Sequence, residues 1–432
     1  MSEILKNNFK YNKYPLKYLV STKITDGPHE TPVFVDEKGV PFISVDGIDN
    51  GQLIISDLRM ISFKDAERYG RKCQPRRGDI LIGKAASTGK IAQVRTDEYF
   101  SIWSPLAMVR PNDLIKSTYL EYFLKSNLGQ IQLDLFANEN TQKNIGMGDL
   151  ERTQILVPPL NDQTKIADYL DKKVFDIDRI VEKEELAIEE LKKYRFSVIS
   201  NGVLHGLKSE KQKTSHYSWI ESYSNSWGLG KIGSLCYLKG RIGWQGLTAS
   251  EYQETGPYLI TGTDFIDGKI NWETCEHITE KRYEEAAPIK VRNGDLLITK
   301  DGTVGKVAIV SDLIGKASLN SGVLLVRGLT NKYINKFLYY VLNSSVFWSW
   351  FEKKQKGNST IVHLYQEQFS GFLFPLPSKD EQESIVVYLD DKCSKIDELI
   401  SIKEDKIETL KAYKKSLIYE CVTGKREVPY AG

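Results

Sequence analysis

Two short segments combine glycines with lysines and hydroxyl side chains, the residue types that bind phosphate groups. They read GKAASTGK (83–90) and KDGTVGK (300–306). Neither fits the nucleotide-binding loop G-x-x-x-x-G-K-[ST]: in the first, five residues separate Gly83 from Gly89, and Ile91 stands where the magnesium-binding hydroxyl is needed. The simplest interpretation is a tight turn between two strands. The alternative is a turn that also contacts DNA phosphates through Lys84, Ser87, Thr88, Lys90, Lys300, Thr303 and Lys306.

Reading a base sequence needs side chains with paired donors and acceptors, such as arginine for guanine and asparagine or glutamine for adenine. Such side chains occur in expected loops, where the competing interpretation is a residue that contacts only water. Aromatic residues offer stacking surfaces, but the cluster from Tyr339 to Phe351 has the spacing of a helix core. Trp103 and Trp244 are less patterned and are kept as candidates for a binding face. The polar candidates are His29, Gln142, Asn144, Arg241, Gln245 and Asn320.

The sequence contains no catalytic constellation. Its five histidines lack metal-ligand spacing, and its five cysteines form no C-x-x-C pair, so neither a metal site nor a disulfide framework is expected. The only Pro-Pro pair, in VPPL (157–160), lacks the flanking residues of an adenine methyltransferase motif, and no Pro-Asp dipeptide opens a nuclease signature. We therefore predict a non-catalytic chain that holds no cofactor or metal of its own.

Composition and charge set broad limits on the class of protein. The chain has 432 residues, a net charge of +2 and no apolar run near the roughly 18 residues that span a bilayer. Its first fifteen residues carry no signal-peptide core, and its scattered cysteines suit a reducing compartment, so a cytoplasmic protein is expected. Outside residues 161–210 and 379–426, 40 basic and 35 acidic side chains remain. That mild excess permits nucleic-acid binding by a local patch without requiring it.

The chain is duplicated. RRGDILIGKAASTGKIAQV (76–94) aligns without a gap with RNGDLLITKDGTVGKVAIV (292–310), at an offset of 216. YLEYFL (119–124) is aligned with YINKFL (333–338). A period this long is unlike the roughly 20–50 residues of solenoid repeats, so the unit that is duplicated is a complete module.

The first part of each module has the sequence pattern of a β-rich globular domain. Residues 14–156 and 227–374 are made of short apolar runs broken by turns, and GDILIGK and GDLLITK are expected strands preceded by Gly-Asp turns. Helices are expected at 117–127 and 333–353.

Each module ends in a long heptad segment. PPLNDQ and PSKDEQ precede the two segments, and Tyr169 aligns with Tyr388. Apolar residues recur at spacings of three and four, as in a helix packed on a helix. We predict two rods of about 38 residues, or ~57 Å, packed antiparallel with Glu184 near Lys403. The seams are Ile166, Leu170, Val174, Ile177, Val181, Ile188, Leu191 and Val198, and Ile385, Leu389, Cys393, Ile396, Ile400, Ile407, Leu410 and Leu417.

This order of elements resembles the DNA specificity subunit of type I restriction-modification systems. The resemblance rests on TDGPHETP (25–32), the Gly-Asp-strand-Gly-Lys segments, the PPLNDQ and PSKDEQ entries and their duplication. It implies an α+β fold in which two β-rich target recognition domains are separated by two long conserved helices, packed as an antiparallel coiled coil with a pseudo-twofold internal duplication. The predicted domains are recognition domain one (1–156), the central long helix (157–210), recognition domain two (211–374) and the C-terminal long helix (375–432).

The resemblance also implies a function. Each recognition domain would read one half of a bipartite double-stranded DNA site. The helices would act as a spacer and bind two modification (methyltransferase) subunits, and restriction subunits would join in the full complex. S-adenosylmethionine, ATP and magnesium are expected on these partners. DGPHETP has no clear counterpart in the second module, where RIGWQGLTASEYQETG (241–256) stands, so no role is transferred there.

Two other classes of protein remain open from the sequence. One is a non-enzymatic scaffold that uses the coiled coil as a spacer and does not bind DNA. The other is a stand-alone methyltransferase or nuclease. A steep salt dependence of DNA affinity separates the first from a specificity subunit, and activity of the purified chain alone would identify the second.

Overall fold

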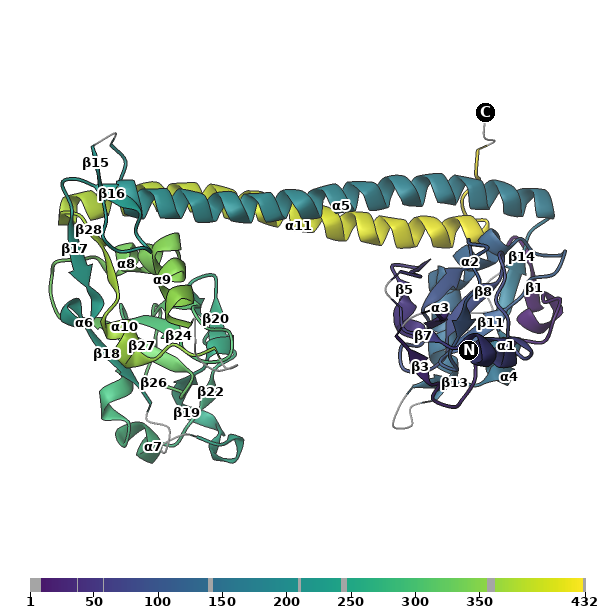
Figure 1. The fold of residues 1–432 in the computed structure, drawn as a ribbon, viewed down its shortest axis with the longest axis horizontal. Coiled ribbons are helices and arrows are strands. Elements are labelled where there is room, and N and C mark those ends of the chain that lie inside the picture. The colour runs from purple at the N-terminus through teal and green to yellow at the C-terminus, as the bar shows by residue number, and fades with distance from the viewer. Residues whose placement is uncertain are drawn as a thin grey trace. The chain divides into compact units, whose positions relative to one another are not determined.

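The fold consists of two units, each built from separate stretches of the helices and one globular part. The computed structural model describes residues 9–36, 38–56, 58–138, 143–208, 211–241, 247–355 and 362–429. Contacts assign Met1–Glu185 and Glu404–Gly432 to unit 1, and Leu186–Lys403 to unit 2. Each unit therefore combines the globular part of one module with segments of both long helices (Figure 1). The four consecutive domains proposed from the sequence stay a prediction.

The described part of unit 1 contains two four-stranded sheets and three two-stranded ones. The strand orders are β2-β11-β8-β9, β10-β4-β7-β3 and β1-β14, with β10 parallel to β4 and all other neighbours antiparallel. A short hairpin, β5–β6, and the pair β12–β13 complete the strands of the described part. Their bounds are β1 Asn12–Pro15, β2 Thr25–Asp26, β3 Phe34–Val35, β4 Val40–Ile43, β5 Ile48–Asp49, β6 Gln52–Leu53, β7 Met60–Ile61, β8 Ile80–Gly83, β9 Ile91–Gln93, β10 Ser101–Ile102, β11 Leu106–Val109, β12 Ala137–Asn138, β13 Asn144–Ile145 and β14 Gln154–Val157.

Unit 2 has sheets of the same sizes, but its parallel pair, β19–β26, lies in the middle of a sheet, whereas β10–β4 lies at an edge. Its sheets run β18-β27-β24-β25, β22-β19-β26-β23 and β17-β28, with β19 parallel to β26 as β4 is to β10. The hairpin β20–β21 corresponds to β5–β6, and a further hairpin, β15–β16, follows the first long helix. The bounds are β15 Gln212–Thr214, β16 Ser222–Ser224, β17 Gly228–Lys231, β18 Cys236–Gly240, β19 Gln253–Ile260, β20 Phe265–Ile266, β21 Lys269–Ile270, β22 Glu276–His277, β23 Lys290–Val291, β24 Leu296–Thr299, β25 Val307–Ile309, β26 Ala317–Leu319, β27 Val323–Gly328 and β28 Leu373–Leu376.

The globular helices also correspond between the units. The predicted helix at 117–127 is α2, and a second helix that was not predicted, α3, follows it after Ser126. The predicted helix at 333–353 is two helices, α8 and α9, with a break at Asn343–Ser344. The aromatic cluster is core as predicted, with Phe347 0% and Trp350 1% exposed. The bounds are α1 Phe63–Gly70, α2 Ser117–Lys125, α3 Asn127–Phe136, α4 Met147–Arg152, α6 Ile232–Leu235, α7 Glu280–Glu284, α8 Asn335–Leu342, α9 Ser345–Gln355 and α10 Gln366–Ser370.

The repeated Gly-Asp turns exist because their aspartates are buried partners of arginines. In unit 1, Arg110 donates two hydrogen bonds to Asp79, from Nε (2.8 Å) and from a terminal nitrogen (2.7 Å). In unit 2, Arg327 binds Asp295 in the same way, at 2.7 and 2.6 Å. Both aspartates are 2% exposed. Such two-pronged pairs fix the geometry as well as the charge balance, which explains why the turn has one form in both units.

The long helices are α5 (Leu160–His205) and α11 (Lys379–Thr423). At 46 and 45 residues they exceed the predicted 38. The prediction ended at the last seam residue, whereas the final turns continue into a core: Cys421 and Val422 of α11 are 0% exposed in unit 1, and Val203 of α5 is 0% exposed in unit 2. Every residue of the two predicted seams is buried or half-buried.

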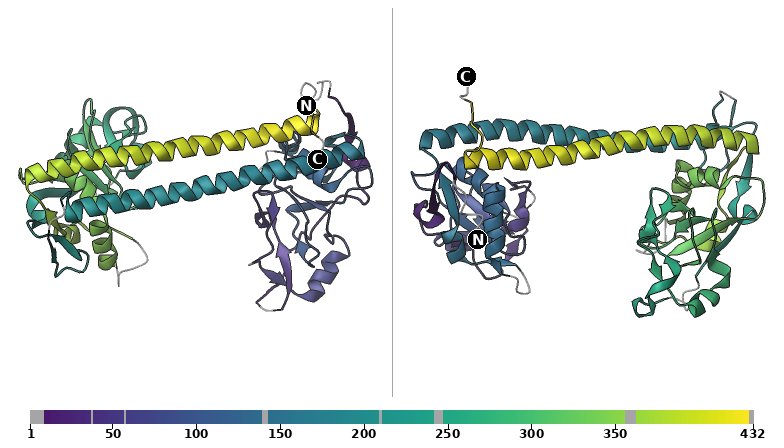
Figure 2. Two further views of the ribbon diagram at one scale, coloured as in Figure 1. Left: turned by 90° about the horizontal axis from the view of Figure 1, so that it is seen from above. Right: turned by 180° about the vertical axis from the view of Figure 1, so that it is seen from behind.

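Segments of α5 and α11 lie side by side and antiparallel in each unit, as predicted (Figures 1 and 2). In unit 1, Asp178 of α5 binds Lys414 of α11 at 2.6 Å; in unit 2, Arg195 of α5 binds Asp397 of α11 at 2.8 Å. Asp178 and Asp397 occupy equivalent positions of the two modules, as do Lys414 and Arg195. The helices therefore pack in the same register in both units. Exposed ion pairs contribute little stability, about 0.2–1 kcal/mol each. The apolar seam therefore supplies most of the stability of the helix pair.

Near the middle of the helices, the structure shows a partner for Glu184. Glu184 binds Lys406 at 2.6 Å, which lies about one helical turn along α11 from Lys403. The predicted pairing of Glu184 with Lys403 stays a prediction.

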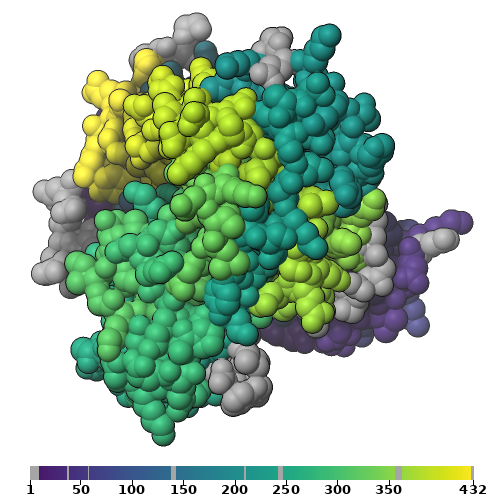
Figure 3. Space-filling view, turned by 90° about the vertical axis from the view of Figure 1, so that its left-hand side faces the viewer, coloured from purple at the N-terminus to yellow at the C-terminus, as the bar shows by residue number. Residues whose placement is uncertain are grey.

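In unit 2 the globular part and the helix segments form one continuous body. The space-filling view shows teal residues at the end of α5 and the following strands in contact with the green globular part and the yellow-green start of α11 (Figure 3). A single core joins Ile199 and Val203 of α5, Ile385 and Leu389 of α11, and Phe337 of α8. Unit 1 has the equivalent core.

We expect the replacement Asp79→Ala to destabilise unit 1 by about 3 kcal/mol or more, because it leaves a partly buried arginine without its counter-charge. The fall should be visible as a lower unfolding temperature in calorimetry. Asp97→Ala is the matched control, since Asp97 forms an exposed pair with Arg77, and it should change the unfolding temperature little. Equal shifts for the two variants would contradict this role of the buried pair.

Candidate nucleic-acid interface

Several of the residues selected from the sequence meet at the ends of the central strands, at one equivalent place in each unit. The amide of Lys84, after β8, donates to the carbonyl of Pro105, and its carbonyl accepts from Ile145. The amide of Lys300, after β24, donates to Gly322, and its carbonyl accepts from Leu364. The backbone frame is therefore the same in both units. We call the side chains around it the strand-end clusters: Asp26, His29, Lys72, Lys84, Trp103 and Asn144 in unit 1, and Arg241, Lys300, Asp301, Asn320 and His363 in unit 2.

The unit 1 cluster is centred on a buried carboxylate. Asp26 is 6% exposed and is approached by Lys72 at 2.7 Å, Lys84 at 3.2 Å and His29 at 3.0 Å. Burial raises the pKa of Asp26, but hydrogen bonds from Lys72 and Lys84 outweigh it and hold the pKa below its ordinary value. One carboxylate shared by two lysines leaves the cluster with excess positive charge, as a surface that meets phosphates requires.

This cluster holds the 25–32 segment against the neighbouring strand. A Cβ at Gly27 would lie 2.0 Å from the carbonyl oxygen of Ile102, so only glycine allows the two backbones to approach this closely. Glu30 further along the segment binds Arg68 of α1 at 2.5 Å. The segment is thus fixed at both ends.

The turn after β8 corrects part of the sequence-based picture. Lys84 was expected at an exposed loop tip, but it is 7% exposed because its ammonium group is drawn to Asp26. Lys90 is half-buried, and its ammonium group donates to the carbonyl of Ile48 at 2.9 Å. Both lysines therefore serve the protein's own structure, and the exposed cation of this cluster is Lys72.

Other candidates in unit 1 are more accessible. Asn144 is exposed and bridges to Ala85 of the turn, and Ser87 and Thr88 of the same turn are half-exposed. Trp103 is half-buried and packs on Phe42, with ring centroids 6.1 Å apart. Asn144, Ser87 and Thr88 can therefore reach a ligand, whereas Trp103 contributes mainly to a small core.

In unit 2 the position equivalent to Asp26 is Gly240, since Asp26 pairs with Ala107 of β11 and Gly240 with the matching Leu324 of β27, and a buried arginine follows it. Arg241 is 4% exposed, and it donates to the carbonyl of Leu319 (2.7 Å) and the hydroxyl of Ser318 (3.0 Å). Burial, and then the charge of Arg282, lower the pKa of Arg241. Its guanidinium is used at the end of β26, and the guanine contact expected from this side chain stays a prediction. Asn320 follows directly and is half-exposed.

His363 is the residue that sequence reasoning missed. The residue after His363, Leu364, donates to the carbonyl of Lys300, as the residue after Asn144, Ile145, donates to that of Lys84. His363 is therefore the equivalent of Asn144. Its Nδ1 is hydrogen-bonded to Asp301, and its ring lies 4.4 Å from that of Tyr365. Lys300 is close to Asp301, at 4.0 Å, while Thr303 and Lys306 of the turn are exposed. The sequence could have indicated this residue: the long heptad segments align at an offset of 219, and the same offset aligns His363 with Asn144.

Three predicted residues, Gln142, Trp244 and Gln245, lie outside the described residues. Among the residues that are described, no three His, Cys, Asp or Glu side chains gather as metal ligands. Within that same part of the chain, no helix is long and apolar enough to cross a membrane.

Comparison with known proteins identifies the family. The family model of the type I restriction modification DNA specificity domain matches residues 29–190 and 224–412, one match for each module. The chain belongs to this family. It is a specificity subunit that recognises the DNA target of a type I restriction-modification system, and it is not itself a catalyst. The resemblance noted in the sequence, and the expected fold, are confirmed.

The relatives cover most of the chain. It is 25% identical over 405 residues to a specificity subunit assigned to the type I restriction enzyme MjaX of Methanocaldococcus jannaschii, covering 91% of this chain and 88% of the relative. It is 23% identical over 363 residues to the StySPI specificity subunit of Salmonella potsdam, covering 82% and 75%.

Solved structures share the fold. A chain from a type I R-M system, studied for its complex assembly and conformational transition, superposes with a TM-score of 0.72 at 15% identity, covering 97% of this specificity subunit and 100% of that chain. The HsdS subunit of Thermoanaerobacter tengcongensis gives 0.50 at 16% identity, covering 98% and 99%.

The lowered pKa of Asp26 predicts an acid-dependent loss of stability in this specificity subunit. A carboxylate whose folded pKa lies below its ordinary 3.8 contributes stability that is fully present above about pH 4 and is lost as the pH falls through the folded value. The unfolding temperatures of the wild type and Asp26→Asn should therefore differ most at neutral pH and converge in acid. Glu67→Gln, at an exposed position, should show no such convergence. A constant difference between wild type and Asp26→Asn at all pH values would refute the assignment.

Proposed function

We propose that this subunit reads a bipartite double-stranded DNA site, one half with each unit, and so directs adenine methylation and restriction by partner subunits in the cytoplasm. The unit 1 and unit 2 strand-end clusters are the proposed contact surfaces. S-adenosylmethionine would belong to the modification subunits, and ATP and magnesium to the restriction subunits.

The observation that carries this proposal is a constant frame with different side chains. The hydrogen bonds that position Lys84 and Lys300 are the same, and the buried pairs behind them are the same. Around this frame, Gly240 stands in place of Asp26 and Arg241 in place of Gly27, while His363 replaces Asn144 and Asn320 replaces Trp103. A non-specific scaffold needs no such divergence at one place, whereas a protein that reads two different half-sites does, because base discrimination depends on the donors and acceptors presented.

Exposed residues divide the contact surface by role. Lys72 and Lys306 are proposed to meet phosphates, which position the protein without specifying a sequence. Ser87, Thr88, Thr303 and Asn320 lie on the same turns and strand ends. Asn144 and His363 are proposed as base-reading residues, one for each half-site.

Apolar side chains that remain exposed on the long helices support the docking of two modification subunits. Ile180 of α5 is 39% exposed, and its equivalent in the second module, Leu399 of α11, is 48% exposed. Tyr413 and its equivalent Tyr194 are 45% and 57% exposed. Each unit thus presents one aliphatic and one aromatic residue at equivalent positions. A surface that occurs twice suits a partner that binds in two copies.

Methylation mapping tests the DNA-reading function. In cells that contain this subunit with its modification subunit, single-molecule sequencing should find a split motif methylated on adenine that disappears when the subunit is deleted.

His363→Ala should relax the motif in one half only, with discrimination at one base falling about tenfold or more, as expected for the loss of one base contact. Asn144→Ala should relax the other half. Lys192→Ala, an exposed change on α5, is the control. An unchanged methylome with an active partner would favour the scaffold.

Docking is tested by charge substitutions on the helices. We expect Ile180→Asp and Leu399→Asp each to weaken the binding of one modification subunit by about 30-fold, the effect of losing an apolar anchor of roughly 2 kcal/mol. Native mass spectrometry would then record one bound copy instead of two. Leu186→Asp is the matched control: Leu186 is 61% exposed, and the equivalent position already carries Asp405. Two bound copies in all three variants would rule out this surface.

A further inference from the structure

Two of the polar contacts between a globular part and its long helix recur at equivalent positions in both units, and the first is made by a buried glutamine. Gln163 of α5 is 0% exposed. Its amide group donates to the carbonyls of Pro158 (2.8 Å) and Leu114 (3.0 Å), and its oxygen accepts from the amide of Lys116 (2.8 Å). In unit 2, Gln382 is also 0% exposed and makes the equivalent bonds, to the Pro377 carbonyl (3.0 Å), the Lys332 carbonyl (3.0 Å) and the Ile334 amide (2.9 Å).

The second contact is a tyrosine–aspartate pair. The hydroxyl of Tyr122 on α2 donates to Asp171 of α5 at 2.7 Å, and the hydroxyl of Tyr340 on α8 donates to Asp390 of α11. Burial, and then the neighbouring carboxylate, raise the pKa of both tyrosines, so the hydroxyls stay protonated and donate. This pairing also corrects the helix alignment from the sequence, in which 119–124 corresponded to 333–338: Tyr122 is equivalent to Tyr340, one helical turn further along.

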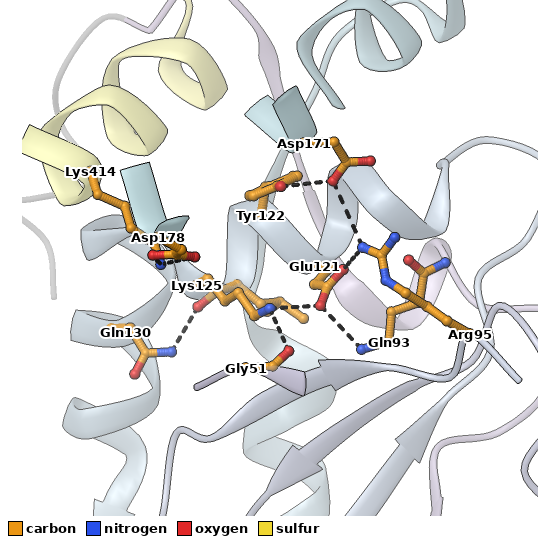
Figure 4. A network of polar contacts seen from close by, with 11 residues as sticks. Gly51, Gln93, Arg95, Glu121, Tyr122, Lys125, Gln130, Asp171, Asp178 and Lys414 are labelled. Carbon is orange, nitrogen blue, oxygen red and sulfur yellow. Dashed lines mark hydrogen bonds and ion pairs between the residues drawn. The ribbon is translucent and has the colours of Figure 1, made fainter. Parts of the chain in front are cut away.

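The two pairs are supported by different residues. In unit 1, a terminal nitrogen of Arg95 lies 3.8 Å from Asp171 and binds the buried Glu121 at 2.8 Å (Figure 4). In unit 2, the cation beside Asp390 is Lys336 of α8, at 3.2 Å. The aspartate has thus kept both a tyrosine donor and a cation, although the cation comes from a different element.

Side chains have also been exchanged where α2 and α8 contact the hairpins β5–β6 and β20–β21. In unit 1, Lys125 binds Glu121 at 2.6 Å and the carbonyl of Gly51, in the β5–β6 hairpin, at 2.9 Å (Figure 4). In unit 2, Tyr339 replaces Glu121, and its hydroxyl would lie 2.5 Å from a Cβ at Gly268, in the β20–β21 hairpin. Both glycines have positive φ, 74° and 75°. An arrangement preserved with different side chains indicates that its geometry, and not only common ancestry, matters.

Two fixed points on a rigid helix define the direction of its axis. Gln163 and Asp171 are eight residues apart, as are Gln382 and Asp390, which separates the points by ~12 Å along the helix. We propose that Tyr122 with Asp171, and Tyr340 with Asp390, are positioning pairs that hold each recognition domain at one angle on its long helix.

This step rests on the proposed function: the angle between recognition domain and helix then affects DNA recognition. A recognition domain held at one angle meets its half-site at one rotational position of the duplex. The positioning pairs would therefore limit which half-site separations are methylated, although neither pair contacts a base.

The angle can be measured within unit 1 without DNA. The five native cysteines are buried, so spin labels on Glu67→Cys in α1 and Glu182→Cys in α5 of the full chain report the distance between globular part and helix. We expect a single narrow distance distribution, broadened about twofold by Tyr122→Phe, which removes a hydrogen bond to a charged acceptor. Tyr18→Phe, at an exposed tyrosine of the same unit, should leave it unchanged. An unaltered distribution in Tyr122→Phe would overturn the proposal. Asp171→Ala, which removes the acceptor, serves as a second variant should Tyr122→Phe fold poorly.

The consequence is measured by methylation rates on DNA whose half-sites stand at the native separation or one base pair longer or shorter. In the complex with modification subunits, we expect the preference for the native separation to fall about fivefold in the Tyr122→Phe, Tyr340→Phe double variant. Equal slowing at every separation would indicate lost stability and overturn the positioning role. Should the wild type methylate no split site, the proposed function fails, while the label distances still decide whether the pairs hold the angle.

Discussion

The apolar seam between α5 and α11 is the constraint on which the other features depend. Neither helix has a complete core of its own within a unit, because buried residues of both helices join the core of each globular part. The seam must therefore be aligned before the recognition domains can be completed. Non-directional apolar contacts do not set a register by themselves, and the equivalent pairs Asp178–Lys414 and Arg195–Asp397 supply the directional part.

Comparison of the two units shows which parts of the duplicated module differ and which keep the same geometry. The Asp79–Arg110 and Asp295–Arg327 pairs, the two buried glutamines and the seam keep the same geometry in both units. The strand-end clusters differ in charge and hydrogen-bonding character at every compared side chain except the lysine. A stiff frame lets the reading residues change without altering where they are held, and the comparisons place the chain in a family whose task is to recognise DNA targets.

Local patterns were sufficient to predict the elements but not the partners of individual side chains. GDILIGK and the heptad seams gave strands and helices because their periodicity is written in consecutive residues. The burial of Lys84 depends on Asp26, and that of Arg241 on Ser318, each far away in the sequence. For the same reason the long helices were predicted too short: their last turns, at Val203 and Val422, are stabilised by a core that the heptad pattern does not contain.

The division of the chain into units has a consequence for its synthesis. Unit 2 is one continuous stretch, Leu186–Lys403, whereas unit 1 needs Glu404 and the residues after it to close its core around Leu417 and Val422. A ribosome that releases the chain from its N-terminus therefore completes unit 2 before unit 1. Until then, the nascent chain carries an open unit 1 whose missing helical turns are still to be translated.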